Sequence, residues 1–190
     1  MPILGILASS RPAIAADTGA MFPLQVVTVG AAGASSVTFS NIPNTYEHLQ
    51  VRAILRSTAS TTNTGLKATF NSTSTNYYAL HQLYGDGSSA IANTNSASSY
   101  AVTGHQTGAS ATSGIFGAMV MDILDYAHTN KNKTVRTLTG YDANGSGLIL
   151  LRSSLWMNTS AITSISFTSE AAGNLAQYSQ FALYGVKGAA

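Results

Sequence analysis

Three tyrosines have side chains suited to binding a ligand: Tyr77, Tyr78 and Tyr84, in the segment NYYALHQLYG. Exposed aromatic rings stack on sugars, so these residues are candidate glycan contacts. Sheet cores and cross-strand pairs also use tyrosine, and a structural role therefore stays open. The chain has four histidines, but no dinucleotide-binding, P-loop, nucleophile-elbow or HExxH pattern. We predict no catalytic residue and no enzyme activity.

One segment has oxygen ligands at the spacing of a calcium loop. Asp142, Asn144 and Ser146 alternate in DANGSG, as in the first half of such a loop. The closing carboxylate is replaced by Ser153, which leaves one formal negative charge. The same residues are typical of a hairpin turn, where Asp and Asn bond their own backbone and Gly takes a positive φ. We predict the turn, with no metal and no cofactor.

Charge is scarce along the chain. Charged residues make up 8% of the 190 positions, with 9 Lys and Arg against 7 Asp and Glu, while 24 Ser and 22 Thr provide much of the polar surface. A nucleic-acid-binding protein needs clustered basic residues. The one basic cluster, Lys131, Lys133 and Arg136, is typical of a solvated turn and strand, with Arg136 free to pair with Asp122 or Asp125. We predict no nucleic-acid partner.

The absence of cysteine excludes disulfides and Cys-ligated zinc, so burial and sheet hydrogen bonds must hold the fold. Mean hydropathy is slightly positive, at +0.14. However, no apolar run approaches the ~20 residues that span a membrane. We expect a soluble protein with no membrane association.

The first 23 residues differ in character from the rest. Pro2, Gly5, Pro12 and Gly19 disfavour a helix. A secretory signal needs positive charge before its apolar core, whereas Arg11 follows it. A cleaved signal is thus the less favoured alternative to an extended arm over residues 1–23. Terminal segments become ordered only when something holds them, so the apolar anchors of the arm imply a docking surface. These assembly residues are Ile3, Leu4, Ile6 and Leu7.

From Leu24 onward, short apolar segments alternate with Gly, Ser, Asn and Asp clusters, the pattern of strands and turns. In HLQVRAILR, from His48 to Arg56, the residues Leu49, Val51, Ala53 and Leu55 share one face and the polar residues the other, with only Ile54 breaking the alternation. Further strands are expected at Gln25–Val29, Val37–Phe39, Leu66–Phe70, Tyr77–Tyr84, Thr134–Thr139, Leu148–Trp156, Ile165–Phe167 and Phe181–Leu183.

These strands predict an all-β protein: an antiparallel β-sandwich of jelly-roll type with an extended N-terminal arm, residues 24–190 forming one domain. Ile115–Tyr126 is a continuous apolar run that fits a central strand or a buried helix. Gly117, Val120 and Ile123 favour the strand. Gly85–Gly114 is rich in Gly, Ser, Ala, Thr and Asn, and we expect a long exposed loop there.

Several stretches resemble a family of small bacteriophage virion proteins. They are MPILGILASS, VTFSNIPNTYEHLQVRAILRS, ATFNSTSTNYYALHQLYGDGSS, MDILDYAHTNKNKTVRTLTGYDANGSG and the closing FALYGVKGA. Together they cover over half of the chain. The most distinctive features are Ile42-Pro43 leading into Tyr46 and Leu183-Tyr184-Gly185 near the end.

This resemblance implies a structural protein of the virion, assembled in the host cytoplasm. Its expected partners are other virion proteins, either the major capsid protein or tail proteins, and further copies of itself in a homotrimer or other homo-oligomer. The favoured function is that of a capsid cement or decoration protein, bound through its arm and surface loops. The alternative is a tail-appendage or head-fibre module that binds a host-surface glycan or receptor.

Overall fold

A computed structural model describes residues 20–75 and 77–188 of the chain. These residues form strands, turns and loops without a helix, so none of them forms a helix able to cross a membrane. The strands are β1 (Met21–Thr28), β2 (Val37–Phe39), β3 (His48–Leu55), β4 (Asn63–Phe70), β5 (Tyr78–Gly85), β6 (Ala90–Ser98), β7 (Ala101–Thr107), β8 (Gly117–Leu124), β9 (Lys133–Asp142), β10 (Gly147–Trp156), β11 (Ile165–Ser169) and β12 (Gln180–Val186).

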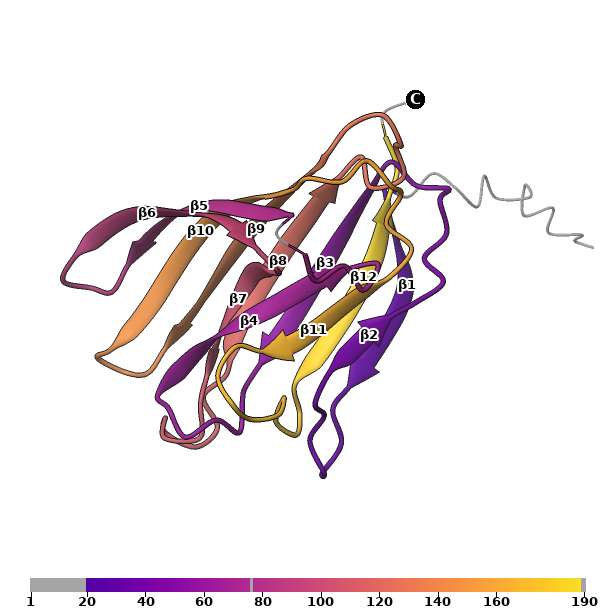
Figure 1. The fold of residues 1–190 in the computed structure, drawn as a ribbon. Coiled ribbons are helices and arrows are strands. Elements are labelled where there is room, and N and C mark those ends of the chain that lie inside the picture. The colour runs from indigo at the N-terminus through magenta and orange to yellow at the C-terminus, as the bar shows by residue number, and fades with distance from the viewer. Residues whose placement is uncertain (1–19, 76, 189–190) are drawn as a thin grey trace, which may run out of the picture.

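The strands form two antiparallel sheets. One sheet has eight strands in the order β1-β12-β3-β8-β9-β10-β5-β6, and the other has four in the order β2-β11-β4-β7. The smaller sheet lies over one face of the larger (Figure 1). The hairpin of β5 and β6 projects past the smaller sheet, at the left of the view. β6 is consequently exposed on both sides along most of its length.

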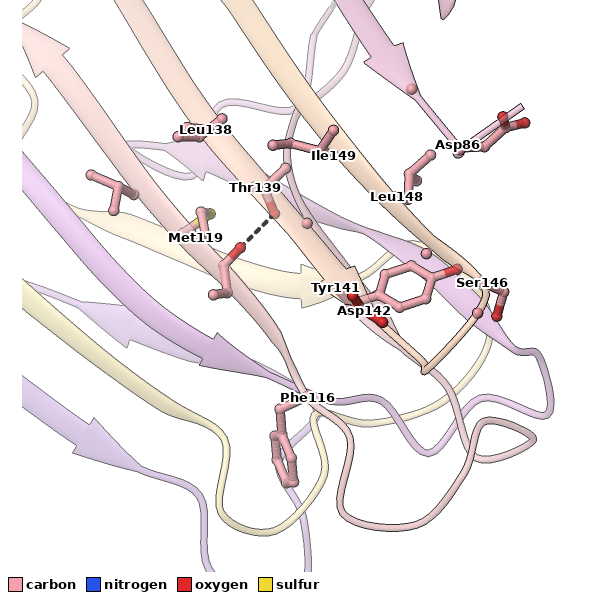
Figure 2. A pocket seen from close by; sticks show the side chains of 17 residues that line it. Asp86, Phe116, Met119, Leu138, Thr139, Tyr141, Asp142, Ser146, Leu148 and Ile149 are labelled. Carbon is pink, nitrogen blue, oxygen red and sulfur yellow. Dashed lines mark hydrogen bonds between the residues drawn. The ribbon is translucent and has the colours of Figure 1, made fainter. Parts of the chain in front are cut away.

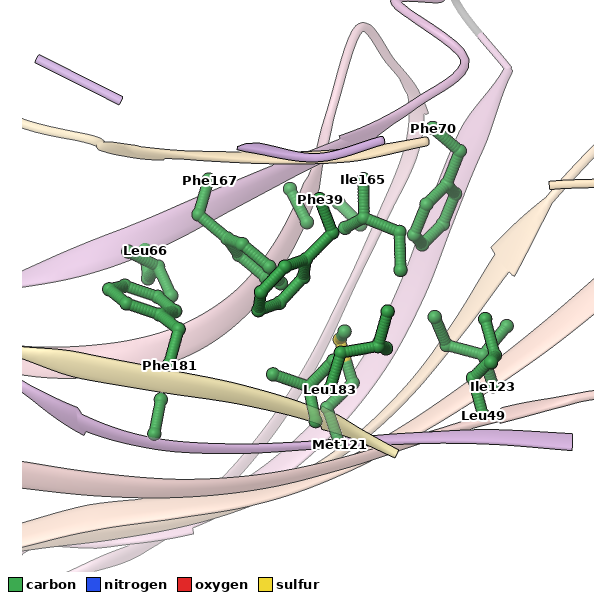
Figure 3. Packing of buried hydrophobic residues seen from close by; sticks show 14 of the residues in the cluster. Phe39, Leu49, Leu66, Phe70, Met121, Ile123, Ile165, Phe167, Phe181 and Leu183 are labelled. Carbon is green, nitrogen blue, oxygen red and sulfur yellow. The ribbon is translucent and has the colours of Figure 1, made fainter. Parts of the chain in front are cut away.

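The hydrophobic core lies between the sheets because alternate residues of each strand point inward. Leu49, Val51 and Leu55 of β3 are fully buried, as their spacing predicted. From the smaller sheet, Phe39 and Phe167 meet edge to face at 6.2 Å, and Phe167 packs at 5.2 Å against Phe181 of the larger sheet. Figure 3 shows these side chains filling the space between the layers. The prediction of an all-β antiparallel protein is confirmed.

The prediction of a long loop from Gly85 to Gly114 is wrong, because this segment contains β6 and β7. β7 pairs with β4 and buries small and hydroxyl side chains such as Ala101, Thr103 and Thr107. Close packing against the larger sheet favours these small residues, since a Cβ added to Gly104 would lie 3.1 Å from the Leu55 side chain of β3. A sequence without large apolar residues can thus form a largely buried strand, even at the edge of its sheet, when the opposing sheet lies close.

Two other predictions concern the segment Ile115–Tyr126 and the N-terminal arm. Ile115–Tyr126 contains the strand β8, which confirms the favoured alternative over a helix. β1 begins at Met21 and pairs with β12, so the sheet starts within the segment predicted as an arm. Residues 1–19, with the predicted anchors Ile3, Leu4, Ile6 and Leu7, lie outside the described residues.

Candidate functional site

The larger sheet carries two neighbouring rows of mostly apolar residues on the face that points away from the core. Cross-strand register defines the rows from β3 through β8, β9, β10 and β5 to β6. We call these twelve positions the outer apolar face. The first row is Ile54, Ala118, Gly140, Ile149, Gly85 and Ala90, and the second is Arg52, Val120, Leu138, Leu151, Leu83 and Ala92.

Large apolar side chains on this face are unusually exposed. Ile149 exposes 61% of its surface, Leu151 55%, Leu83 54% and Leu138 52%. Contiguous apolar patches on soluble proteins commonly mark interaction sites. The one charged member, Arg52, donates from Nε to Gln50 Oε1 at 2.9 Å and lies over the Tyr184 ring, so its guanidinium leans toward β12. The rest of the face is therefore uncharged.

Sequence reasoning missed this face, although a signal for it was present. β8 and β10 contain the apolar stretches AMVM and LILL, in which both faces of the strand are apolar. Such runs are typical of strands covered on both sides. Here the inner residues, such as Met119 and Leu150, are buried, while Val120 and Ile149 remain exposed. Ile54, the residue that broke the alternation of its strand, belongs to the same face.

A hollow of about 770 Å³ lies at the end of the outer apolar face formed by its first row (Figure 2). Its lining includes the small residues Ala118, Gly140 and Gly85 and the large residues Leu138 and Ile149. A Cβ on Gly140 would collide with the Leu148 carbonyl oxygen, so no side chain can fill this part of the hollow. The face thus combines a projecting Ile149 with an adjoining depression.

A polar row borders the second row of the face. Asp122, Arg136, Ser153 and His81 follow one another across β8, β9, β10 and β5. Gln50 Nε2 donates to Asp122 Oδ1 at 2.8 Å and holds that carboxylate at the border. A second hollow, of about 510 Å³, lies between this row and the apolar residues Leu83 and Leu151. An apolar centre with a polar rim is the usual composition of a protein interface.

A separate cluster at one end of the larger sheet contains potential metal ligands. Ligand atoms of Glu47, His48 and Asp125 lie within 4.8 Å of one another. Two of these atoms already have partners: His48 Nδ1 accepts from the Asp125 backbone N–H at 3.0 Å, and Lys131 Nζ pairs with Asp125 Oδ2 at 2.5 Å. The hydrogen bond with Lys131 is the main reason that the pKa of Asp125 is lowered. This geometry fits a neutralised ionic cluster better than a cation site.

Two further titratable groups lie in the interior between β7 and the larger sheet. Arg152 donates from Nε to Gln82 Oε1 at 2.7 Å and from Nη1 to the Gly104 carbonyl at 3.1 Å. Burial lowers its pKa to about 10. His105 Nε2 lies 2.9 Å from Asn63 Oδ1, and burial, with the nearby Arg152 charge, lowers its pKa to about 4. Both groups are held by structural partners.

The structure does not bring the three tyrosines together. Tyr78 is 1% exposed, and its hydroxyl accepts from the Phe70 backbone N–H and donates to the Thr73 carbonyl. Its ring therefore belongs to the core and is closed to a glycan, which corrects its assignment as a contact. Tyr77 is 43% exposed. Tyr84 is half-buried at the other end of β5, six residues or ~20 Å from Tyr78.

Two predicted features remain, the calcium-like segment and the basic cluster. Asp142 begins the turn between β9 and β10, where its Oδ1 accepts from the Asn144 backbone N–H at 2.8 Å and Asn144 has a φ of 57°.

The basic side chains of the predicted cluster have different surroundings. Lys133 is buried, and its Nζ donates to the carbonyls of His128, Lys131 and Thr159 at 2.5–2.9 Å, whereas Arg136 lies exposed on the outer face.

Comparison with known proteins gives no family assignment. The chain matches no protein-family model, and no curated protein matches it. Function must therefore be inferred from the fold, from the outer apolar face and from the chemistry of the residues around it.

Proposed function

We propose that the two sheets form a jelly roll widened by two inserted hairpins. Eight strands remain when β5–β6 and β9–β10 are set aside. Of these, the first pairs with the last (β1 with β12), the second with the seventh (β2 with β11), the third with the sixth (β3 with β8) and the fourth with the fifth (β4 with β7). This nested pairing supports the jelly-roll assignment, and the inserted hairpins lengthen one sheet only.

We further propose that the chain is a structural protein of a bacteriophage virion, a capsid cement or decoration protein that contacts neighbouring capsid subunits. Jelly rolls are common in viral capsid proteins and in lectins. The observation that carries the proposal is the outer apolar face, because a protein that works through contact area needs such a surface. The resemblance of the sequence to small virion proteins agrees with it.

The chemistry of the described residues favours contact over catalysis. His105 and Arg152 are enclosed by the sheets. Asp125 is neutralised by Lys131 at the end of the sheet. The larger hollow lies over Leu138, Ile149 and glycines, with its acidic residues Asp86 and Asp142 at the hairpin ends. No nucleophile and base converge in the described part of that hollow, and we propose that the protein is not an enzyme.

A second candidate is a tail-appendage or head-fibre module that binds a host-surface glycan. The observation in its favour is the hollow of about 510 Å³, which places His81, Arg136 and Thr94 beside Leu83 and Leu151. Hydrogen-bonding groups next to apolar ones are the composition of many ligand sites. Binding of the purified protein to an array of host-surface glycans, lost in Arg136→Ala, would favour this candidate over the capsid one.

The test uses particles of the phage whose genome encodes the chain. A phage lacking the gene is complemented with the wild-type protein, with Leu138→Glu, or with Met157→Glu as a control at an exposed apolar residue outside the face. We expect the wild type and Met157→Glu to copurify with capsids and to raise their resistance to heat, and Leu138→Glu to do so less. Purified capsids and tails that both lack the wild-type protein would reject the proposal.

A further inference from the structure

We infer that the outer apolar face is an interface between two copies of this chain, packed sheet against sheet about a two-fold axis. The inference deepens the proposed assembly function, with the arm and the surface loops left to contact the capsid, and rests on that function for its biological setting. Each copy packs its outer apolar face against the same face of the other copy. Three observations on the described residues carry it: the size of the face, its shape and the distribution of its charges.

The outer side of the larger sheet is large enough for a stable dimer. The six strands that carry the face span about 24 Å at ~4.8 Å spacing and about 26 Å over eight residues, so the apolar rows and the polar row beside them lie on roughly 600 Å² of planar area. A standard protein interface buries about 800 Å² on each partner. The side chains of Ile149, Leu151, Leu83 and Leu138, each more than half exposed, raise the true surface above the planar value.

The shape of the face is self-complementary. The two-fold axis lies between the two packed sheets, parallel to the strands and above the midline between β9 and β10. Rotation about this axis places each residue of β9 over the residue of β10 in the other copy that is its cross-strand partner. Gly140 then faces Ile149 of the second copy, because these two residues are partners in the ladder. The most exposed side chain of the face thereby enters the hollow that Gly140 leaves open. The same operation places Leu138 against Leu151.

The charges at the border agree with this arrangement. The axis that pairs Gly140 with Ile149 also places Asp122 over His81 of the second copy and Arg136 over Ser153. The four residues lie in one cross-strand row, and the two strands of each pair are equally far from the axis. No like charges are opposed within these two pairs. Opposed like charges would cost several kcal/mol and reject the contact. Two sheets packed face to face, about 10 Å apart, also exclude water from the apolar rows.

The first experiment measures association in solution. Sedimentation velocity from about 1 to 100 μM compares the wild type, Leu138→Glu, Leu151→Lys and the control Met157→Glu. We expect dimers for the wild type and the control and monomers for both face variants, with unchanged circular dichroism because the substituted side chains are exposed. A monomeric wild type, an odd-numbered assembly, or dimers that survive both face substitutions would overturn the inference.

The second experiment tests the orientation with cysteines, which the natural chain lacks. Val120 and Leu83 lie three strands or ~14 Å apart within one copy, beyond the reach of a cross-linker that spans the ~10 Å between packed sheets. In the proposed dimer, Val120 of one copy lies over Leu83 of the other. A short bifunctional thiol reagent that spans the ~10 Å between packed sheets should therefore give a covalent dimer for the double variant Val120→Cys/Leu83→Cys and not for either single variant. Equal cross-linking of a single variant, or none in the double variant, would overturn this two-fold arrangement.

The two proposals fail separately. A dimer that Leu138→Glu dissolves would stand even if virus particles lacked the protein. Conversely, a monomeric protein that enters capsids would keep the proposed function and remove the dimer interface. Particle composition therefore reports on the function, and the sedimentation coefficient reports on the interface.

Discussion

Ile149 lies directly across from Gly140 in the β9–β10 ladder, so the most exposed apolar side chain of the outer face adjoins a residue with no side chain. Within one copy, this pairing leaves Ile149 projecting beside a hollow. The buried neighbours of Ile149 on the other side of the sheet, such as Leu150, already stabilise β10. The outer residues of the strand should accordingly contribute little to the folding of one copy.

Truncation of leucine should destabilise the fold strongly on the inner face of the larger sheet and weakly on its outer face. Leu55→Ala removes a fully buried side chain of β3 and should lower the free energy of unfolding by about 2–5 kcal/mol. Leu138→Ala removes a half-exposed one and should change it by less than about 1 kcal/mol. Urea denaturation at low protein concentration, where self-association does not contribute, measures both values. Equal losses would mean that the outer face is part of the core.

We predict that Arg56 stabilises the fold, although the alternation of its strand placed it on the exposed polar face. Its guanidinium donates to the carbonyls of Ala111 and Thr112 at 3.0 Å and of Ile115 at 2.6 Å. Hydrogen bonds from a charged group contribute about 1.5–3 kcal/mol. We expect Arg56→Ala to lower stability by about 1–3 kcal/mol and to expose residues 108–116 to limited proteolysis. Arg136→Ala, on the outer face, is the matched control and should leave both unchanged.

Acid should destabilise the protein through His105. Its pKa is about 4 in the folded chain and about 6.5 when unfolded, because burial disfavours the charged ring. Between these values the unfolded state binds more protons, so stability falls as the pH drops from about 6.5 to 4, by up to about 3 kcal/mol. His105→Gln, which keeps a donor for Asn63, should flatten this part of the profile. Urea midpoints measured at half-unit pH steps would show whether it does.

Calcium should have no effect on the melting temperature. Asp142 Oδ1 already accepts the Asn144 backbone N–H, and the loop offers one carboxylate where a calcium loop offers several. Melting curves in EDTA and in millimolar calcium should superimpose. A calcium-dependent rise of several degrees that Asp142→Asn abolishes would mean that this turn binds the ion.

Removal of residues 1–17 should separate folding from assembly on the particle. The described sheets begin at Met21 and enclose a core built from residues of β1 onward, so the truncated chain should retain its circular dichroism. Loss of the apolar anchors Ile3, Leu4, Ile6 and Leu7 should prevent its incorporation into capsids. Quantitative mass spectrometry of purified particles is the measurement, and incorporation at the wild-type level would remove the role of the arm.

The sequence alone determined the strands whose two faces differ in polarity. Alternation in HLQVRAILR placed Leu49, Val51 and Leu55 in the core, and the same pattern located β2, β11 and β12, because a period of two is a local property of a strand. The lack of cysteine and the turn chemistry of Asp142 and Asn144 are equally local. All these features depend on residues that are near neighbours in the chain.

Tertiary structure decided the features that depend on what lies opposite each strand. Tyr78 is buried because Phe70 and Trp156 pack against it, and β7 is largely buried because β4 pairs with it and the larger sheet covers it. The outer apolar face combines the consecutive strands β8, β9 and β10 with β3 and β5, which are distant from them in sequence and adjacent only in the sheet. Runs such as LILL show that both faces of a strand are apolar, but only the stacking of the sheets decides which face stays uncovered.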